Sequence, residues 1–130
     1  MLVIMGRVPL FSKEIRRFVK FINKESPLDD EIRLVVLPHA EILEDRAPVA
    51  PDEEDDPTPY YGIYHPALHS IWVALGMFYP EHLDMALLII AHEYYHAQQE
   101  FMEVKWDERQ ADAWAVKSVI QYIRHKRGNR

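Results

Sequence analysis

Ala91-His92-Glu93-Tyr94-Tyr95-His96-Ala97 is the stretch from which the rest of the chain can be interpreted. On an α-helix, its two histidines share one face, with Cβ atoms roughly 5–6 Å apart. Two imidazole nitrogens on that face can bind one Zn²⁺ at about 2.0–2.1 Å. Glu93 lies about 100° further round the helix, so it flanks such a metal without binding it. There it can take the proton of an attacking water molecule.

The segment around this motif is predicted to be one long helix, from about Glu81 to Met102. Its stretch from Leu83 to Ala91 is largely apolar, which is typical of a buried central helix. Burying a His-Glu-His triple there without partners would cost several kcal/mol, and a metal ion removes that cost. The alternative interpretation is that His92 and His96 face solvent, because the helix becomes polar after Tyr95.

Two acids downstream, Glu108 and Asp112, complete the predicted site. Catalytic zinc takes three protein ligands and keeps one position open. The chain has no cysteine, so the third ligand must be a histidine or a carboxylate. A last helix, capped by Asp107 and running to about Lys126, returns Glu108 to the metal if it packs antiparallel to the motif helix. Asp112 then accepts a hydrogen bond from a ligand imidazole. Alternatively, both are surface acids favoured by the helix dipole.

The composition predicts one soluble globular domain spanning residues 1–130. Hydrophobic residues make up 48% and charged residues 28% of the chain, which are ordinary values for such a domain. A net charge of −6 argues against nucleic acid as the main partner. No signal peptide or membrane-spanning run is recognised, so the expected location is cytoplasmic. The oligomeric state is not predicted.

The remaining pattern predicts a small α+β fold. The other expected elements are a short strand or arm within residues 1–10, a helix at 12–24, and strands at 32–37, 60–64 and 70–74. The last two strands form a hairpin around a turn flanked by His65 and His69, which are interpreted as surface histidines. Residues 39–59 form an acidic, proline-rich loop. It is interpreted as a solvated mobile loop, with a cation site or a lid as alternatives.

His92-Glu93-x-x-His96 followed by Glu108-x-x-x-Asp112 resembles the pattern of the gluzincin clan of zinc metallopeptidases. The short chain and the short interval before Glu108 are most similar to the minigluzincins. The resemblance covers about residues 71–116. It implies a zincin-like fold with a short mixed or antiparallel sheet. That sheet would pack on an N-terminal helix, a buried active-site helix and a C-terminal helix.

The resemblance also implies roles for individual residues. His92, His96 and Glu108 would bind Zn²⁺, Glu93 would be the general base, and Asp112 would support a ligand. The strand that contains Ile71, Trp72, Val73 and Ala74 would lie at the rim of the cleft and pair with an extended peptide substrate. Some minigluzincins are latent, with a terminal segment in the cleft. Here the tail at 124–130 or the acidic loop is the candidate for that segment.

The sequence departs from related patterns at several points. Gln99 and Met102 stand where the metzincin extension has a glycine and a third histidine. No C-terminal subdomain is recognised that would supply a donor to the oxyanion.

The expected activity is therefore that of a zinc metalloendopeptidase acting on peptides or unfolded proteins. Two alternatives stay open. One is a non-proteolytic or regulatory zinc-binding protein, such as a toxin–antitoxin or stress-response component. The other is a metal-free helical scaffold.

Overall fold

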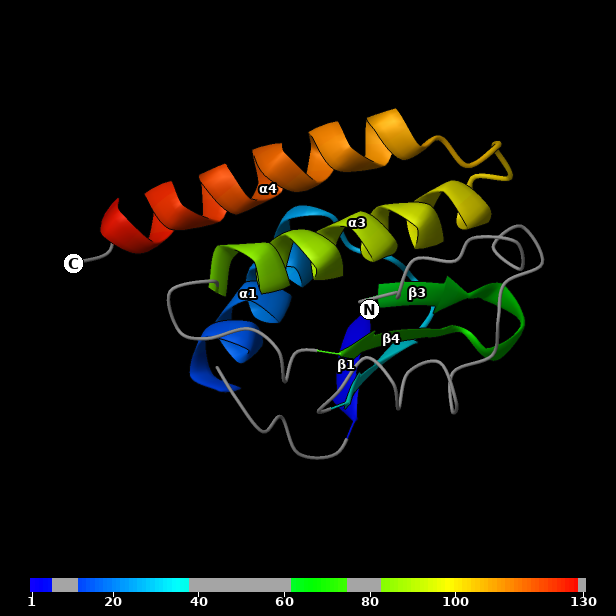
Figure 1. Cartoon of the computed structure of the whole chain (residues 1–130), viewed down its shortest axis with the longest axis horizontal. Helices are drawn as coiled ribbons and strands as arrows, with labels where there is room; N and C mark the ends of the chain where they lie inside the picture. Colours follow the sequence, from blue (N-terminus) through cyan, green and yellow to red (C-terminus); the bar gives the residue numbers. More distant parts are fainter. Residues whose placement is uncertain (6–11, 38–61, 75–82, 129–130) are drawn as a thin grey trace.

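The computed structural model describes residues 1–5, 12–37, 62–74 and 83–128. Within these ranges, helices lie on one face of a four-stranded mixed sheet (Figure 1), which confirms the predicted α+β class. The elements are β1 (Leu2–Met5), α1 (Ser12–Glu25), β2 (Ile32–Leu37), β3 (Gly62–His65), β4 (Ser70–Ala74), α3 (Leu83–Phe101) and α4 (Glu108–Gly128). The predicted loop at 39–59 lies outside the described residues, as do residues 6–10, 60–61, 81–82 and 129–130, which belong to predicted segments.

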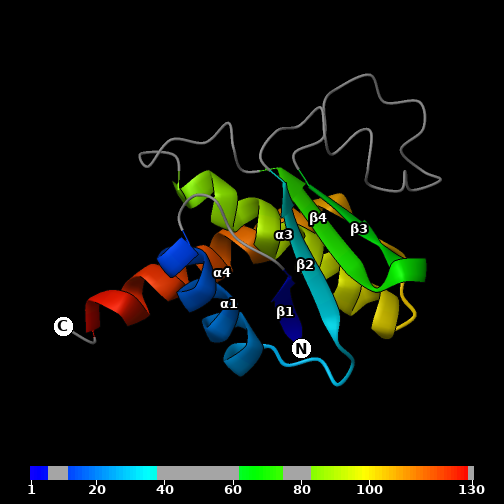
Figure 2. The ribbon, with the colours of Figure 1, turned by 90° about the horizontal axis from the view of Figure 1, so that it is seen from below.

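The sheet has the strand order β1-β2-β4-β3, and Figure 2 shows β2, β4 and β3 side by side. β1, β2 and β4 are parallel, whereas β3 is antiparallel to β4. The register pairs Leu2 with Ile32 and Leu34 with Ile71, so these apolar side chains lie on the same face. The predicted hairpin of β3 and β4 is confirmed, and its turn contains a short 3₁₀ helix at Pro66–Leu68.

The core lies between this sheet face and the helices. α1 contributes a stripe at three- and four-residue spacing, and its members Ile15, Phe18, Val19 and Ile22 are all buried. α3 contacts both β3 and β4, while α4 packs along α3 (Figure 1). α3 is therefore the central helix, as predicted. Among the described helices, none combines the length and apolar character needed to cross a membrane.

The turn between α3 and α4 is built from specific backbone bonds. Glu103 has a left-handed backbone with φ of 56°. Its N–H bonds to the carbonyl of Glu100, and the N–H of Val104 bonds to the carbonyl of Gln99. These two bonds form a Schellman motif, which ends α3. Asp107 then caps α4 by accepting the N–H of Gln110 at 3.0 Å, as the sequence predicted.

The far end of α4 is tied to the start of α1. The carboxylate of Glu14 accepts hydrogen bonds from the hydroxyl of Tyr122 at 2.8 Å and from the ammonium of Lys126 at 2.9 Å. Burial opposes ionisation of Glu14, but these two bonds and the charges of Lys126 and Arg17 together outweigh it and hold its pKa below the ordinary 4.5. Lys126 lies roughly 27 Å along the helix axis from Glu108, given a rise of about 1.5 Å per residue. Residues 124–128 thus belong to α4 and do not fill the predicted cleft.

Candidate metal centre

α3 presents both histidines of the motif on one face. Their rings are nearly perpendicular, with centroids 4.7 Å apart, and their Nε2 atoms are 3.1 Å apart. His96 is 2% exposed, so the interpretation that it faces solvent is wrong. His92 is partly buried, with 19% of its side chain exposed. The pair therefore lies where the buried part of the helix meets the surface.

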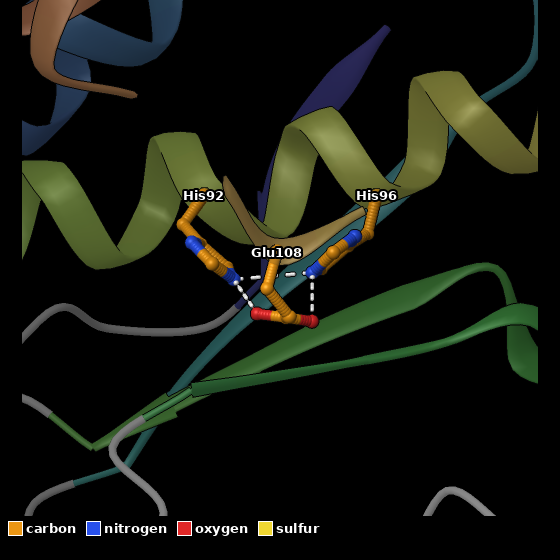
Figure 3. Close-up of side chains that lie close together, drawn as sticks. All are labelled: His92, His96 and Glu108. Atoms are coloured by element: carbon orange, nitrogen blue, oxygen red, sulfur yellow. Dashed lines mark hydrogen bonds and ion pairs between the residues drawn. The ribbon is translucent and has the colours of Figure 1, made fainter. Parts of the chain in front are cut away.

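Glu108, the first residue of α4, reaches both imidazoles (Figure 3). One carboxylate oxygen lies 2.8 Å from Nε2 of His92, and the other lies 2.9 Å from Nε2 of His96. One ligand atom from each of the three residues lies within 4.8 Å of the others. His92, His96 and Glu108 thus form a group able to hold a metal ion, and the predicted juxtaposition is confirmed. The side chain of Glu108 is 69% exposed, so solvent reaches this member of the group.

Each histidine also has a partner on its other ring nitrogen. Nδ1 of His92 lies 2.7 Å from a carboxylate oxygen of Asp112, the contact that the sequence predicted. Nδ1 of His96 lies 3.0 Å from the amide oxygen of Gln99. The sequence had indicated no partner for His96. The available signal was a polar residue three positions further along a buried helix, on nearly the same face as His96.

These contacts determine where the protons lie on the two rings once a cation occupies the Nε2 side, because without one the carboxylate of Glu108 is a second acceptor for each ring. A carboxylate can only accept, so Nδ1 of His92 donates to Asp112. An amide oxygen can also only accept, so Nδ1 of His96 donates to Gln99. In the neutral rings, both Nε2 atoms then carry lone pairs, and both point at the carboxylate of Glu108. One proton can bridge only one of the two contacts between an Nε2 atom and Glu108. A metal cation can accept lone pairs from all three side chains at once.

Glu93 lies on the sheet side of the motif helix and is 8% exposed. β3 passes α3 very closely at this level. A Cβ added to Gly62 would lie 3.4 Å from Cγ of Glu93 and 2.5 Å from Cγ2 of Ile89. Gly62 is therefore required for space, since any side chain would push β3 away from the helix. This close approach places the side chain of Glu93 between α3 and the sheet edge.

The expected role of the strand with Ile71, Trp72, Val73 and Ala74 is wrong. This strand is β4, which is hydrogen-bonded to β2 on one side and to β3 on the other. It has no open edge on which a peptide could add as a further strand. Within the described sheet, β3 is the edge strand on this side, and it also contacts the motif helix.

The hairpin histidines stay apart from the centre. His65 is half-buried on β3, and His69 is exposed, with its ring 6.2 Å from that of Phe101. Neither belongs to the group of described residues that could hold a metal ion.

Comparison with known proteins adds no assignment. No family model matches the chain, and the searches of curated proteins and of solved structures also found no match.

Proposed function

We propose that this chain is a zinc-dependent peptidase of the minimal gluzincin type. The observation that carries the proposal is the convergence of two imidazole lone pairs and one carboxylate, from His92, His96 and Glu108. Two nitrogens and one oxygen, with a side open to solvent, are typical of catalytic zinc sites. Ligand atoms bound tetrahedrally at about 2.0–2.1 Å lie roughly 3.3–3.4 Å apart. The two Nε2 atoms are 3.1 Å apart, close to that spacing, and the oxygens of Glu108, at 2.8 and 2.9 Å from them, would move outward by about half an ångström.

Zinc held there would supply Lewis-acid activation of water and of the scissile carbonyl. Glu93 would act as general base, because it follows the first ligand on the helix and lies at the sheet side of the site. Its carboxylate would take a proton from the attacking water and deliver it to the leaving amine. Asp112 would keep the lone pair of His92 directed at the metal by accepting the Nδ1 proton.

The peptide substrate would extend along β3. This strand is at the edge of the described sheet, and its residue Gly62 lies beside Glu93. In strand addition, the sheet edge holds the substrate through hydrogen bonds to the substrate's main chain. These bonds do not depend on which side chains the substrate carries. We expect peptides or unfolded proteins as substrates, with modest sequence preference.

The test is to measure zinc content and peptide hydrolysis in wild type and in three variants. Glu93→Gln should retain zinc and lose hydrolysis, whereas Glu108→Ala should lose zinc as well. Asp84→Asn, an exposed acid at the start of the same helix, is the matched control and should change neither. Equal hydrolysis by wild type and Glu93→Gln would refute the mechanism. Unchanged zinc content in Glu108→Ala would remove the third ligand.

The regulatory zinc-protein hypothesis makes a different prediction. Wild type would bind zinc but cleave no peptide, both as the full chain and after residues 39–59 are replaced by a short linker. Hydrolysis that appears only in the shortened form would instead show a latent peptidase. A wild type that retains no zinc would support the scaffold hypothesis.

A further inference from the structure

Gln99 contacts both a histidine of the proposed zinc centre and the turn that leads to Glu108. It is 1% exposed and lies near the C-terminal end of α3. Its amide oxygen accepts from Nδ1 of His96 at 3.0 Å and from the backbone N–H of Asp107 at 3.3 Å. One buried oxygen therefore joins a metal-binding side chain to the residue that precedes Glu108.

The bond from Asp107 fixes the orientation of the Gln99 amide. A backbone N–H can only donate, so the atom that it reaches must be the amide oxygen and not the nitrogen. The contact with His96 is then N–H to oxygen, with the proton on Nδ1. This tautomer leaves Nε2 as a lone pair directed at Glu108.

The main chain of Gln99 holds the same turn. Its carbonyl accepts the N–H of Val104 at 3.0 Å, so Gln99 contacts the turn near both ends, at Val104 and at Asp107. Because Asp107 caps α4, the position of the cap sets where Glu108 begins. The amide nitrogen of Gln99 is buried without a hydrogen-bond partner among the described atoms. Its oxygen is therefore the part of the side chain with bonds to lose.

We infer that Gln99 is a positioning residue for the metal centre. It holds His96 in the tautomer that binds metal and places the cap from which Glu108 reaches the same ion. The inference rests on the proposed zinc site and adds a residue to it. Gln99 touches neither the metal nor the substrate, so it acts only through His96 and Asp107.

The decisive variants differ in the acceptor alone. Gln99→Met removes the oxygen and keeps a similar volume, so zinc affinity should fall roughly 10–100-fold, as when other partners of metal-binding histidines are lost. Gln99→Glu keeps an oxygen that can accept from both His96 and Asp107, and its carboxylate is the stronger acceptor, so zinc affinity should not fall. Gln98→Met, one position along the same helix, is the matched control and should also bind like wild type.

Two measurements separate this inference from the proposed function. The first is zinc affinity by competition with a chromophoric chelator. The second is long-range ¹H–¹⁵N correlation of the imidazoles in the metal-free protein, which reports the tautomer directly. Wild type and Gln99→Glu should show the proton of His96 on Nδ1, and Gln99→Met should show it on Nε2.

Each failure then has its own signature. If wild type binds no zinc, the proposed centre fails, whatever Gln99 does to the tautomer. If wild type, Gln98→Met and Gln99→Met all bind zinc equally, the centre stands and the role of Gln99 is refuted. A Gln99→Glu variant as weak as Gln99→Met would also refute it, because the acceptor would then not be the operative group.

Discussion

The imidazole of His96 lies flat against the indole of Trp106, with ring centroids 4.7 Å apart and planes 17° from parallel. Trp106 is held in turn by a hydrogen bond from its Nε1 to Glu100 at 3.0 Å and by the ring of Tyr64 at 5.7 Å. The imidazole of His96 is thus supported on its face by Trp106 and on its edge by Gln99. A positive charge arriving at Nε2 is felt directly by the indole, since the aromatic face attracts cations.

Trp106 should therefore report metal binding through its fluorescence. Zinc addition to the metal-free protein should change the tryptophan emission, because the stacked imidazole becomes more electron-poor. Trp106→Phe should abolish most of this change and Trp72→Phe should keep it, as Trp72 lies on the sheet and bonds to Ser70. A response that persists fully in Trp106→Phe would contradict the stacking geometry. Titrations of the three proteins at equal concentration provide the measurement.

Gly62→Ala should damage the catalytic side of the site more than the metal side. The added Cβ would lie 2.5 Å from Cγ2 of Ile89. Because a β-branched side chain has few alternative rotamers, β3 must move away from α3. We expect a loss of about 1–3 kcal/mol in the free energy of unfolding, as for other overpacked positions. Peptide hydrolysis should fall while zinc affinity is kept. Gly128→Ala, where nothing lies within 4 Å, is the control and should be close to neutral.

The bond network of Glu14 should make stability depend on pH. Its pKa is lowered in the folded protein, so the unfolded chain binds the proton more readily, and folding stability falls as pH falls through the folded pKa. Wild type should exceed Glu14→Gln at neutral pH by about 0.2–1 kcal/mol. Well below pH 4.5 the difference should vanish. Denaturant unfolding at both pH values measures this, with Glu25→Gln, an exposed acid of the same helix, as control.

Glu103→Gly should stabilise the protein. Glu103 has φ of 56°, a conformation that costs a residue with a Cβ roughly 1–2 kcal/mol. Glycine adopts it freely but loses more entropy on folding, so the net gain should be about 0.5–1 kcal/mol. Thermal unfolding of both proteins without metal measures it. A lower unfolding temperature for Glu103→Gly would show that the side chain contributes more than its backbone conformation costs.

Local sequence pattern accounts for most of the fold. The apolar stripe of α1 and the β-branched run at 32–37 predicted their elements closely. Each element buries one face, and the spacing of its apolar residues shows which face that is. Spacing alone also brought His92, His96 and Glu108 together, since two of them share a helix face and the third follows a short turn.

The sequence pattern did not predict the order of the strands in the sheet. Whether residues 70–74 lie at an edge or inside the sheet depends on pairing with Arg33–Leu37, far away in sequence. Periodicity reports which side chains are buried, not which strand lies next to which. The contacts of Gln99 and Trp106 with His96 were not predicted, for a related reason. Trp106 lies in the turn after α3, where irregular backbone leaves no period, and the contact of Gln99 with Asp107 depends on how that turn folds back. Only the spacing of Gln99 from His96 was a local signal.

The position of the donors in the chain has a consequence for folding. His92 and Glu108 are only 16 positions apart, whereas Arg33 of β2 and Ser70 of β4 are 37 apart, so closing the first loop costs about 0.7 kcal/mol less. An ion held by His92, His96 and Glu108 needs only α3, α4 and the turn between them, because none of these donors lies on the sheet. It would then stabilise a partly folded chain as well as the native one. The gain in stability with zinc concentration should accordingly fall short of the value expected from native-state affinity alone.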